Sequence, residues 1–337
     1  KNAHNLNESL YLEGNKGFDV RTYTADAVSP KAIIDDLRFA PDLVWVKDRD
    51  RVTNHGIVDS VRGAGTGKVL QSDASTAEYG DGGEIDSFDS NGITVSTGAV
   101  NYSWFNFGTD DYVAWNWLES VDYGFDIVSY VGTGIAHTES HNLGVVPEMM
   151  IVKNRESVQS WPVYHKYLNG GTNPEQYRIF LDLSAVEAAS STQWNDTAPT
   201  SSVFTVGTNS QVNENSKDHI AYLFASVEGY SKVFSYTGNG VADGPFVYCG
   251  FRPKFIITKN PNRATDWTMM DTERDTYNAM DAKLRPDDTA AESTFSILDF
   301  YSNGFKLRGN DASMNASGEY IIGIAFAETP FPWANAR

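Results

Sequence analysis

Short apolar runs separated by turn residues fill most of the chain, and stretches with a helical period of 3.6 residues are nearly absent. In FDSNGITV and FYSNGFKL, the pairs Asn91-Gly92 and Asn303-Gly304 separate two apolar segments, which is the pattern of a tight β-hairpin. Three segments of helical composition (STAEYG, SAVEAA and DTAAES) are short enough to be loops. The pattern therefore predicts an all-β protein built from antiparallel sheets.

One strand-like phrase occurs three times, as FAPDLVWVKDR, VVPEMMIVKNR and FRPKFIITKNP. Both intervals between its prolines are 106 residues (147 − 41 and 253 − 147), at Pro41, Pro147 and Pro253. A lysine recurs at the same interval, at Lys47, Lys153 and Lys259, and so does a ring side chain, at His55, Trp161 and Trp267. A fixed interval of this kind indicates one structural unit repeated along the chain. We therefore expect three tandem antiparallel β-sandwich repeats, jelly-roll-like and about 106 residues long.

The repeat boundaries divide the chain into an N-terminal arm (1–17) and three sandwiches (18–120, 121–227 and 228–337). The connections at 119–124 and 227–230 are too short to act as flexible tethers, so the sandwiches should pack as a rigid row. The chain begins at Lys1 rather than at an initiator Met, so we expect a processed product or a fragment of a longer protein.

The net negative charge of the chain argues against polyanionic partners. The chain has 26 Lys+Arg and 44 Asp+Glu, a net charge of −18, which would repel nucleic acid and anionic lipid. No apolar stretch is long enough to cross a bilayer. The single cysteine, Cys249, lies in the apolar run FVYCGF, and we expect it to be a buried small hydrophobe. With one cysteine the chain has no disulfide framework and no cysteine-based zinc site.

Several motifs resemble known binding motifs but lack residues that those motifs require. The stretch RGAGTGKVL (62–70) resembles a phosphate-binding loop, but Arg62 stands where the first glycine is needed and Val69 where Ser or Thr is needed. His137 and His141 lack a third metal ligand in sequence. We therefore predict no catalytic residue, cofactor or metal site, and no enzymatic activity. Two questions stay open: whether any acidic loop binds calcium, and whether two carboxylates approach as in a glycosidase.

One loop departs from its counterparts. The second and third repeats carry the polar segments TNSQVNENSK and NDASMNAS where the first has AVNYSWFNFGTD. Four aromatic residues therefore occupy the position of a solvated loop: Tyr102, Trp104, Phe105 and Phe107. Either they cap the core of the first repeat or contact a neighbouring chain, or they form a stacking platform for a sugar or receptor. These four are our ligand or interface candidates. Trp115, Trp117, Trp161 and Trp267 are expected in strands, within the core.

Several long strings carry a family resemblance: PDLVWVKDR (41–49), VEGYSKVFSYTGNG (227–240), GFRPKFIITK (250–259), SNGFKLR (302–308) and IAFAETPF (324–331). They resemble an uncharacterised repeat domain of bacteriophage, mainly marine phage, tail-fibre-like and other virion structural proteins. The resemblance covers residues 18–332. In relatives the repeat often follows a laminin-G-like domain, which would account for the arm at 1–17.

The resemblance implies a structural protein of the virion, exposed on its tail or capsid surface. The leading hypothesis is a part of a tail fibre or spike that presents β-sandwich modules to a host glycan or receptor. The alternatives are a capsid decoration or head-fibre protein and a tailspike polysaccharide depolymerase. Because fibres are commonly homotrimers, we expect self-association of this kind, together with contacts to other virion proteins, and neither nucleic-acid binding nor membrane insertion.

Overall fold

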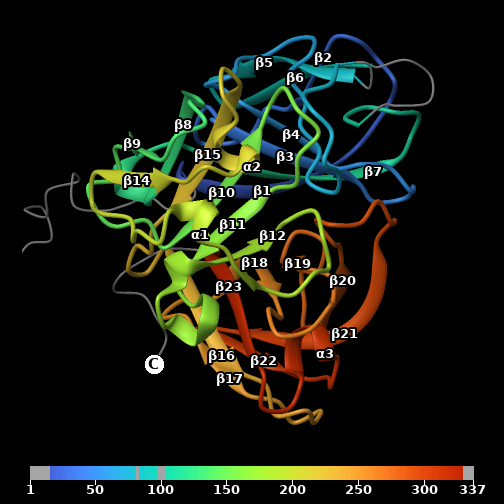
Figure 1. The fold of residues 1–337 in the computed structure, drawn as a ribbon. Coiled ribbons are helices and arrows are strands. Elements are labelled where there is room, and N and C mark those ends of the chain that lie inside the picture. The colour runs from blue at the N-terminus through green and yellow to red at the C-terminus, as the bar shows by residue number, and fades with distance from the viewer. Residues whose placement is uncertain (1–15, 81–82, 98–103, 329–337) are drawn as a thin grey trace, which may run out of the picture.

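The computed structural model describes residues 16–80, 83–97 and 104–328, and most of the regular structure in these ranges is β-strand (Figure 1). All pairings between the strands are antiparallel, so the predicted fold class is confirmed at this level. We refer to residues 16–120, 121–227 and 228–328 as the first, second and third lobes. In Figure 1 they run from blue to teal, from green to yellow and from orange to red.

Each lobe contains one large sheet with a common strand order. In the first lobe the order is β1 (Phe18–Thr24), β7 (Asp111–Trp117), β3 (Leu43–Asp48) and β4 (Gly56–Asp59). In the second it is β8 (Phe125–Val131), β15 (Asp218–Phe224), β10 (Met149–Asn154) and β11 (Pro162–His165), extended by β12 (Tyr177–Phe180) and β13 (Ala188–Ala189). In the third it is β16 (Ser231–Thr237), β23 (Tyr320–Ala327), β18 (Pro253–Lys259) and β19 (Thr268–Asp271).

A second sheet in each lobe belongs to the outer layer (Figure 1). The first outer sheet has the order β2 (Lys31–Ile34), β6 (Gly92–Thr97) and β5 (Gly83–Asp89). The second pairs β9 (His137–Ser140) with β14 (Val203–Val206), and the third has the order β17 (Phe246–Tyr248), β22 (Gly304–Leu307), β21 (Ser293–Tyr301) and β20 (Met280–Lys283). The two predicted hairpins are confirmed, since Asp89 pairs with Gly92 and Tyr301 with Gly304.

Helical turns in the described ranges are short and lie in the connections. The α-helical turns are α1 (Ser191–Trp194), α2 (Ser210–Asn213) and α3 (Ala312–Asn315). The 3₁₀ turns are η4 (Val121–Tyr123), η5 (Leu168–Gly171) and η6 (Pro174–Gln176). None of the helices in these ranges has the length and apolar character needed to span a membrane.

Both faces of the large sheets are buried, which explains why their strands read as unbroken apolar runs rather than as alternating ones. In β3, Val44 and Val46 face the outer sheet of their own lobe, whereas Leu43 and Trp45 face a second core. That second core is shared by all three lobes. Its members include Trp45, Trp115, Trp117, Met149, Ile151, Phe224, Phe255, Ile257 and Phe326.

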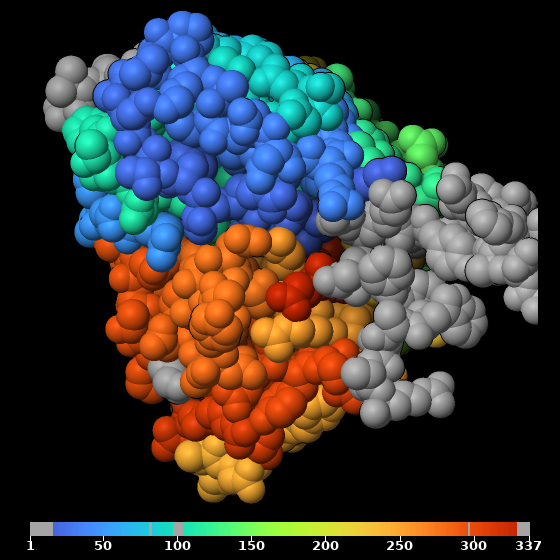
Figure 2. Space-filling model, turned by 180° about the vertical axis from the view of Figure 1, so that it is seen from behind, coloured from blue at the N-terminus to red at the C-terminus, as the bar shows by residue number. Residues whose placement is uncertain are grey.

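The shared core brings the first and third lobes into contact, so the expectation that the units pack as a rigid row is wrong. In a row the first and third lobes would be apart, but the Phe18 and Phe326 ring centroids are 4.6 Å apart and those of Trp117 and Phe255 are 6.1 Å apart. Figure 2 shows the first lobe, in blue, directly against the third, in orange. Each large sheet has an apolar face with no outer sheet over it, and that face is covered by the other two lobes.

Candidate functional site

The lobes meet along three seams, and one backbone contact recurs at each. The backbone N–H of a glutamate donates to a carbonyl of the adjoining lobe at 2.8–2.9 Å. The pairs are Glu78 with Arg155, Glu187 with Pro261, and Glu292 with Arg49. The three acceptors are 106 residues apart (155 − 49 and 261 − 155), so the interval seen in the sequence places equivalent residues at the seams. We name the seams by the lobes they join: 1/2, 2/3 and 3/1.

The ring side chains that recur in the sequence also cross the seams. Trp161 Nε1–H donates to the Gln71 carbonyl at 2.9 Å, and Trp267 Nε1–H donates to the Phe180 carbonyl at 2.8 Å. His55 Nε2 lies 2.9 Å from the carbonyl of Arg285. The four tryptophans predicted for the core are buried, although Trp161 and Trp267 directly precede β11 and β19 instead of lying in strands.

The recurring lysines are buried at the same places. Lys153 Nζ donates to the Ser75 carbonyl at 2.8 Å across seam 1/2, and Lys259 Nζ donates to the Ser184 carbonyl at 3.0 Å across seam 2/3. Lys47 Nζ instead bonds within its lobe, to the Asp48 and Arg51 carbonyls. Burial lowers the pKa of each of these lysines to about 8.

A carboxylate beside each ring residue completes the arrangement. Asp73, Asp182 and Asp287 accept the backbone N–H of His55, Trp161 and Trp267. Burial raises the pKa of Asp73 to about 6 and that of Asp287 to about 7, and it raises the pKa of Asp182 as well. Each of these acids therefore holds, within its own lobe, the backbone of a ring residue whose side chain crosses a seam.

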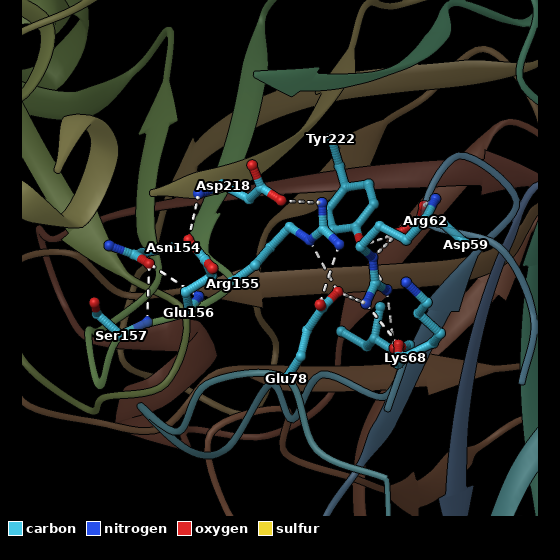
Figure 3. Close-up of polar contacts among 11 residues, drawn as sticks. Asp59, Arg62, Lys68, Glu78, Asn154, Arg155, Glu156, Ser157, Asp218 and Tyr222 are labelled. Carbon is cyan, nitrogen blue, oxygen red and sulfur yellow. Dashed lines mark hydrogen bonds and ion pairs between the residues drawn. The ribbon is translucent and has the colours of Figure 1, made fainter. Parts of the chain in front are cut away.

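Seam 1/2 is held by a charged network (Figure 3). Arg155 donates two hydrogen bonds to the Glu78 carboxylate, of 2.9 and 3.1 Å, and Arg62 donates one to the same carboxylate at 2.9 Å. Arg62 also pairs with Asp59, which accepts the Tyr222 hydroxyl from the second lobe at 2.7 Å. Burial alone would lower the pKa of Arg62, but Tyr222, Asp59 and Glu78 together raise it above its ordinary value. The guanidinium is thus charged and fully paired.

Seam 3/1 repeats this network with different residues. Arg49 bonds the Glu292 carboxylate at 2.8 and 3.1 Å, and Arg274 reaches it at 3.0 Å. Arg274 pairs with Asp271 at 2.7 Å, and Asp271 accepts Trp115 Nε1–H from the first lobe at 3.1 Å.

Seam 2/3 lacks the two arginines of these networks. Pro261 stands in the place of Arg49 and Arg155, and the position of the other seams' Asp-Arg pair (59 and 62, 271 and 274) holds His165 and Leu168. His165 Nε2 lies 3.2 Å from the Gly323 carbonyl, and burial lowers its pKa to about 3, so it donates as a neutral ring. Glu187 accepts the Tyr320 hydroxyl and the Asn169 N–H.

A groove of about 510 Å³ opens between the second and third lobes. Two tyrosines line it, and each has a lysine over its ring: Lys166 lies 5.0 Å from the Tyr167 centroid, and Lys232 lies 5.1 Å from the Tyr248 centroid. Glu148 pairs with Lys166 at 2.7 Å. Aromatic surface beside charged and hydroxyl groups, in a hollow of this size, suits a polar organic ligand.

The structure divides the aromatic candidates chosen from the sequence. Tyr102 lies outside the described residues. Trp104 and Phe105 are 2% and 0% exposed and belong to the sandwich core of the first lobe, so neither side chain can contact a ligand. Phe107 is half-buried, and the Arg51 guanidinium lies 3.8 Å from its ring centroid. Of the two alternatives, core capping therefore describes Trp104 and Phe105.

The other sequence motifs have structural roles in the described ranges. Arg62, which breaks the phosphate-loop pattern, is the centre of seam 1/2. Cys249 is buried, and burial raises the pKa of its thiol to about 12. His141 Nε2 lies 3.1 Å from the Thr200 carbonyl, and His137 Nε2 bonds Glu139 at 2.8 Å. Within the described residues no three metal-ligating side chains come together.

Sequence reasoning missed the groove, because its walls come from segments far apart in the chain. The only signal was the alternation Phe246, Val247, Tyr248 within a run that looked uniformly apolar.

Comparison with known protein families gives one match. A family model described as a domain of unknown function, DUF7483, matches residues 13–330. The chain belongs to this family. The match spans all three lobes, so the DUF7483 domain comprises the whole closed arrangement rather than one sandwich. No curated protein shows significant similarity to the chain.

Proposed function

We propose that this DUF7483 chain is a structural protein of a bacteriophage virion, part of a tail fibre or spike that attaches the particle to a host surface. The sequence resemblance to phage virion proteins supports the setting. The observation that carries the attachment role is the groove beside seam 2/3, where Tyr167 and Tyr248 offer aromatic surface next to Lys166, Lys232 and Glu148.

We propose further that each lobe is one copy of a unit of about 106 residues. The common strand order of the large sheets, the 106-residue interval and the backbone contact that recurs at all three seams support this. A closed set of lobes with a common core makes a rigid body. Rigid support for surface side chains lowers the entropic cost of binding.

The role we propose is binding rather than catalysis. The half-buried carboxyls with raised pKa values, Asp73 and Asp287, accept the backbone N–H groups of ring residues that cross the seams, which is a structural use of such groups. Self-association as a homotrimer remains our prediction. It would use the outer surfaces of the lobes, because the shared core is already filled by one chain. Light scattering on the purified chain tests it: we expect about three times the monomer mass of 37.2 kDa.

Immunogold electron microscopy on intact particles tests the virion assignment. We expect antibody against residues 18–328 to label the tail or its fibres. Label spread over the head would overturn the attachment role in favour of a capsid decoration protein, and unlabelled particles would overturn the virion assignment itself.

Host adsorption of particles that carry Tyr167→Ala tests the groove. We expect adsorption to weaken about tenfold, which corresponds to about 1.4 kcal/mol. Tyr277→Ala is the matched control, because Tyr277 is 82% exposed in the third lobe and is not among the residues that line the groove. Equal adsorption by both variants would remove the groove from the attachment surface.

A further inference from the structure

The outer sheet of the third lobe presents aromatic side chains to solvent. Phe246 and Tyr248 are 45% and 60% exposed and alternate along β17 with Val247, which points into the sandwich core. Tyr301, at the end of β21, is 37% exposed. We call Phe246, Tyr248 and Tyr301, with the glycine between them, the aromatic face.

The glycine forms the floor of this face. Gly304 pairs with Tyr248 on one side and with Tyr301 on the other, so the two tyrosines flank a position that has no side chain. A Cβ at Gly304 would lie 3.1 Å from the Phe246 ring and 2.0 Å from the Val247 carbonyl oxygen. The Phe246 and Tyr301 ring centroids are 6.1 Å apart at an interplanar angle of 66°. The aromatic rings therefore flank the backbone of β22 at Gly304, where there is no side chain.

The fold does not require these aromatic residues. The first lobe has the same hairpin, and Gly92 packs there against the Ile34 carbonyl as Gly304 packs against that of Val247. In the first lobe the positions of Phe246, Tyr248 and Tyr301 hold Ile33, Asp35 and Asp89. A sheet of this design is thus built without exposed rings. Exposed aromatic residues gathered on one face indicate a contact surface.

Two of the cations beside the aromatic face are paired with carboxylates. Arg308 bonds the Asp299 carboxylate at 2.5 Å and the Tyr301 hydroxyl at 2.6 Å. Lys306 pairs with Asp243 at 2.7 Å. These two cations lie beside two carboxylates, and Lys232, over the Tyr248 ring, is a third cation at this face, on a chain whose net charge is −18. Such a surface does not attract a polyanion, but it offers donors and acceptors to hydroxyl groups.

We propose that the aromatic face binds a neutral polysaccharide, with sugar rings laid on Phe246, Tyr248 and Tyr301. A pyranose has an apolar C–H face that matches an aromatic ring and a rim of hydroxyls that matches the Arg308–Asp299 pair. Tyr248 also lines the groove, so a longer chain continues from the aromatic face towards Tyr167. This inference rests on the proposed attachment function and names its ligand class.

The test uses the purified full chain and immobilised polysaccharides. The neutral probes are dextran, mannan and galactan, and the anionic probes are alginate and chondroitin sulfate. We expect at least one neutral probe to bind, with an affinity that changes little between 50 and 500 mM NaCl, because no charge is neutralised on binding. Binding by none of the neutral probes, or binding of the anionic probes alone with loss in salt, overturns the proposal.

Variants localise the binding. We expect Phe246→Ala with Tyr301→Ala to weaken binding at least tenfold, while Tyr277→Ala and Ile33→Ala bind as the unaltered chain does. Circular dichroism and the melting temperature check that the double variant is folded. If it is not, Tyr248→Asp, which copies Asp35 of the first lobe, replaces it with the same expected loss. Undiminished binding by a folded variant overturns the proposal.

Two further results separate the proposals. Exposed rings could instead join two copies of the chain, in which case the double variant would lower the mass in light scattering and leave sugar binding unchanged; that result overturns the polysaccharide site. Gold-labelled tails without sugar binding overturn this inference and leave the attachment function standing. Sugar binding without label on particles supports this inference and overturns the virion assignment.

Discussion

Seams 1/2 and 3/1 carry buried Arg-Glu networks, and seam 2/3 does without one, yet all three have the same backbone contact. The glutamate N–H bond across the seam has nearly the same length at Glu78, Glu187 and Glu292. The ring residue and the buried lysine recur as well. The geometry of a seam is therefore set by backbone bonds and apolar packing, and the ion pairs are an addition to it.

The free-energy cost of burying charges explains how seam 2/3 can lack an Arg-Glu network. A buried ion pair gains little over well-packed neutral residues, because removing two charges from water offsets most of their attraction. Removing only one partner is costly, since it leaves a buried charge unpaired. His165 and Leu168 are therefore a consistent replacement for an Asp-Arg pair, whereas either change alone would not be. The groove also lies between the second and third lobes, which are the lobes joined by seam 2/3.

Breaking one charged seam should give the largest effect. We expect Arg62→Leu to lower the free energy of unfolding by about 3 to 5 kcal/mol, because Asp59 would remain as a buried carboxylate without a cation, while Glu78 keeps Arg155. Guanidinium denaturation measures it. The double variant Asp59→His with Arg62→Leu copies seam 2/3, and we expect it to recover at least half of the loss. Equal losses in the single and double variants would contradict the view that the networks are replaceable.

Asp287 at seam 2/3 should make the free energy of unfolding fall as the pH rises, whereas the lowered pKa of His165 at the same seam makes it rise with pH. The pKa of Asp287 is about 7 in the folded chain and about 4 in an unfolded one, so between pH 4 and 7 the folded state keeps a proton that the unfolded state releases. Stability contributed by this group is therefore present at about pH 4 and lost as the pH rises to 7. We expect a loss of about 2 kcal/mol, reduced from the full shift because the carboxyl is partly exposed.

Urea denaturation between pH 4 and 8 measures this slope. Asp287→Asn keeps an acceptor for the Trp267 N–H and cannot ionise, so the stability of the variant should fall less, or rise more, between pH 4 and 7 than that of the unaltered chain. Asp182→Asn makes the same change at seam 1/2, where burial also raises the pKa, and serves as the matched comparison. A larger change of slope from Asp182→Asn than from Asp287→Asn would reverse the order of the two seams.

The sequence predicted the strands and hairpins well, because continuous apolar runs and Asn-Gly turns are local signals. It also placed equivalent residues, since the 106-residue interval needs no structure to be seen. The sequence did not predict how the lobes pack against one another. The run LVWV predicts a strand, but only the fold shows that Leu43 and Trp45 pack in the core shared with the other lobes. The sequence left open whether Trp104 caps the core or forms a contact surface, because its counterparts in the other repeats are polar, and its burial selects the core.

Adding a charge to seam 2/3 should have the smallest effect. Pro261→Arg keeps the carbonyl that accepts the Glu187 N–H and places a guanidinium where Arg49 and Arg155 stand in the other seams. A partly exposed pair with Glu187 would add at most about 1 kcal/mol, and loss of the proline would remove about 0.4 to 1 kcal/mol by loosening the unfolded chain. We therefore expect a net change within about 0.5 kcal/mol in denaturant unfolding, with a new dependence on salt. A gain above about 2 kcal/mol would mean that charge, rather than the backbone bond and packing, determines the strength of a seam.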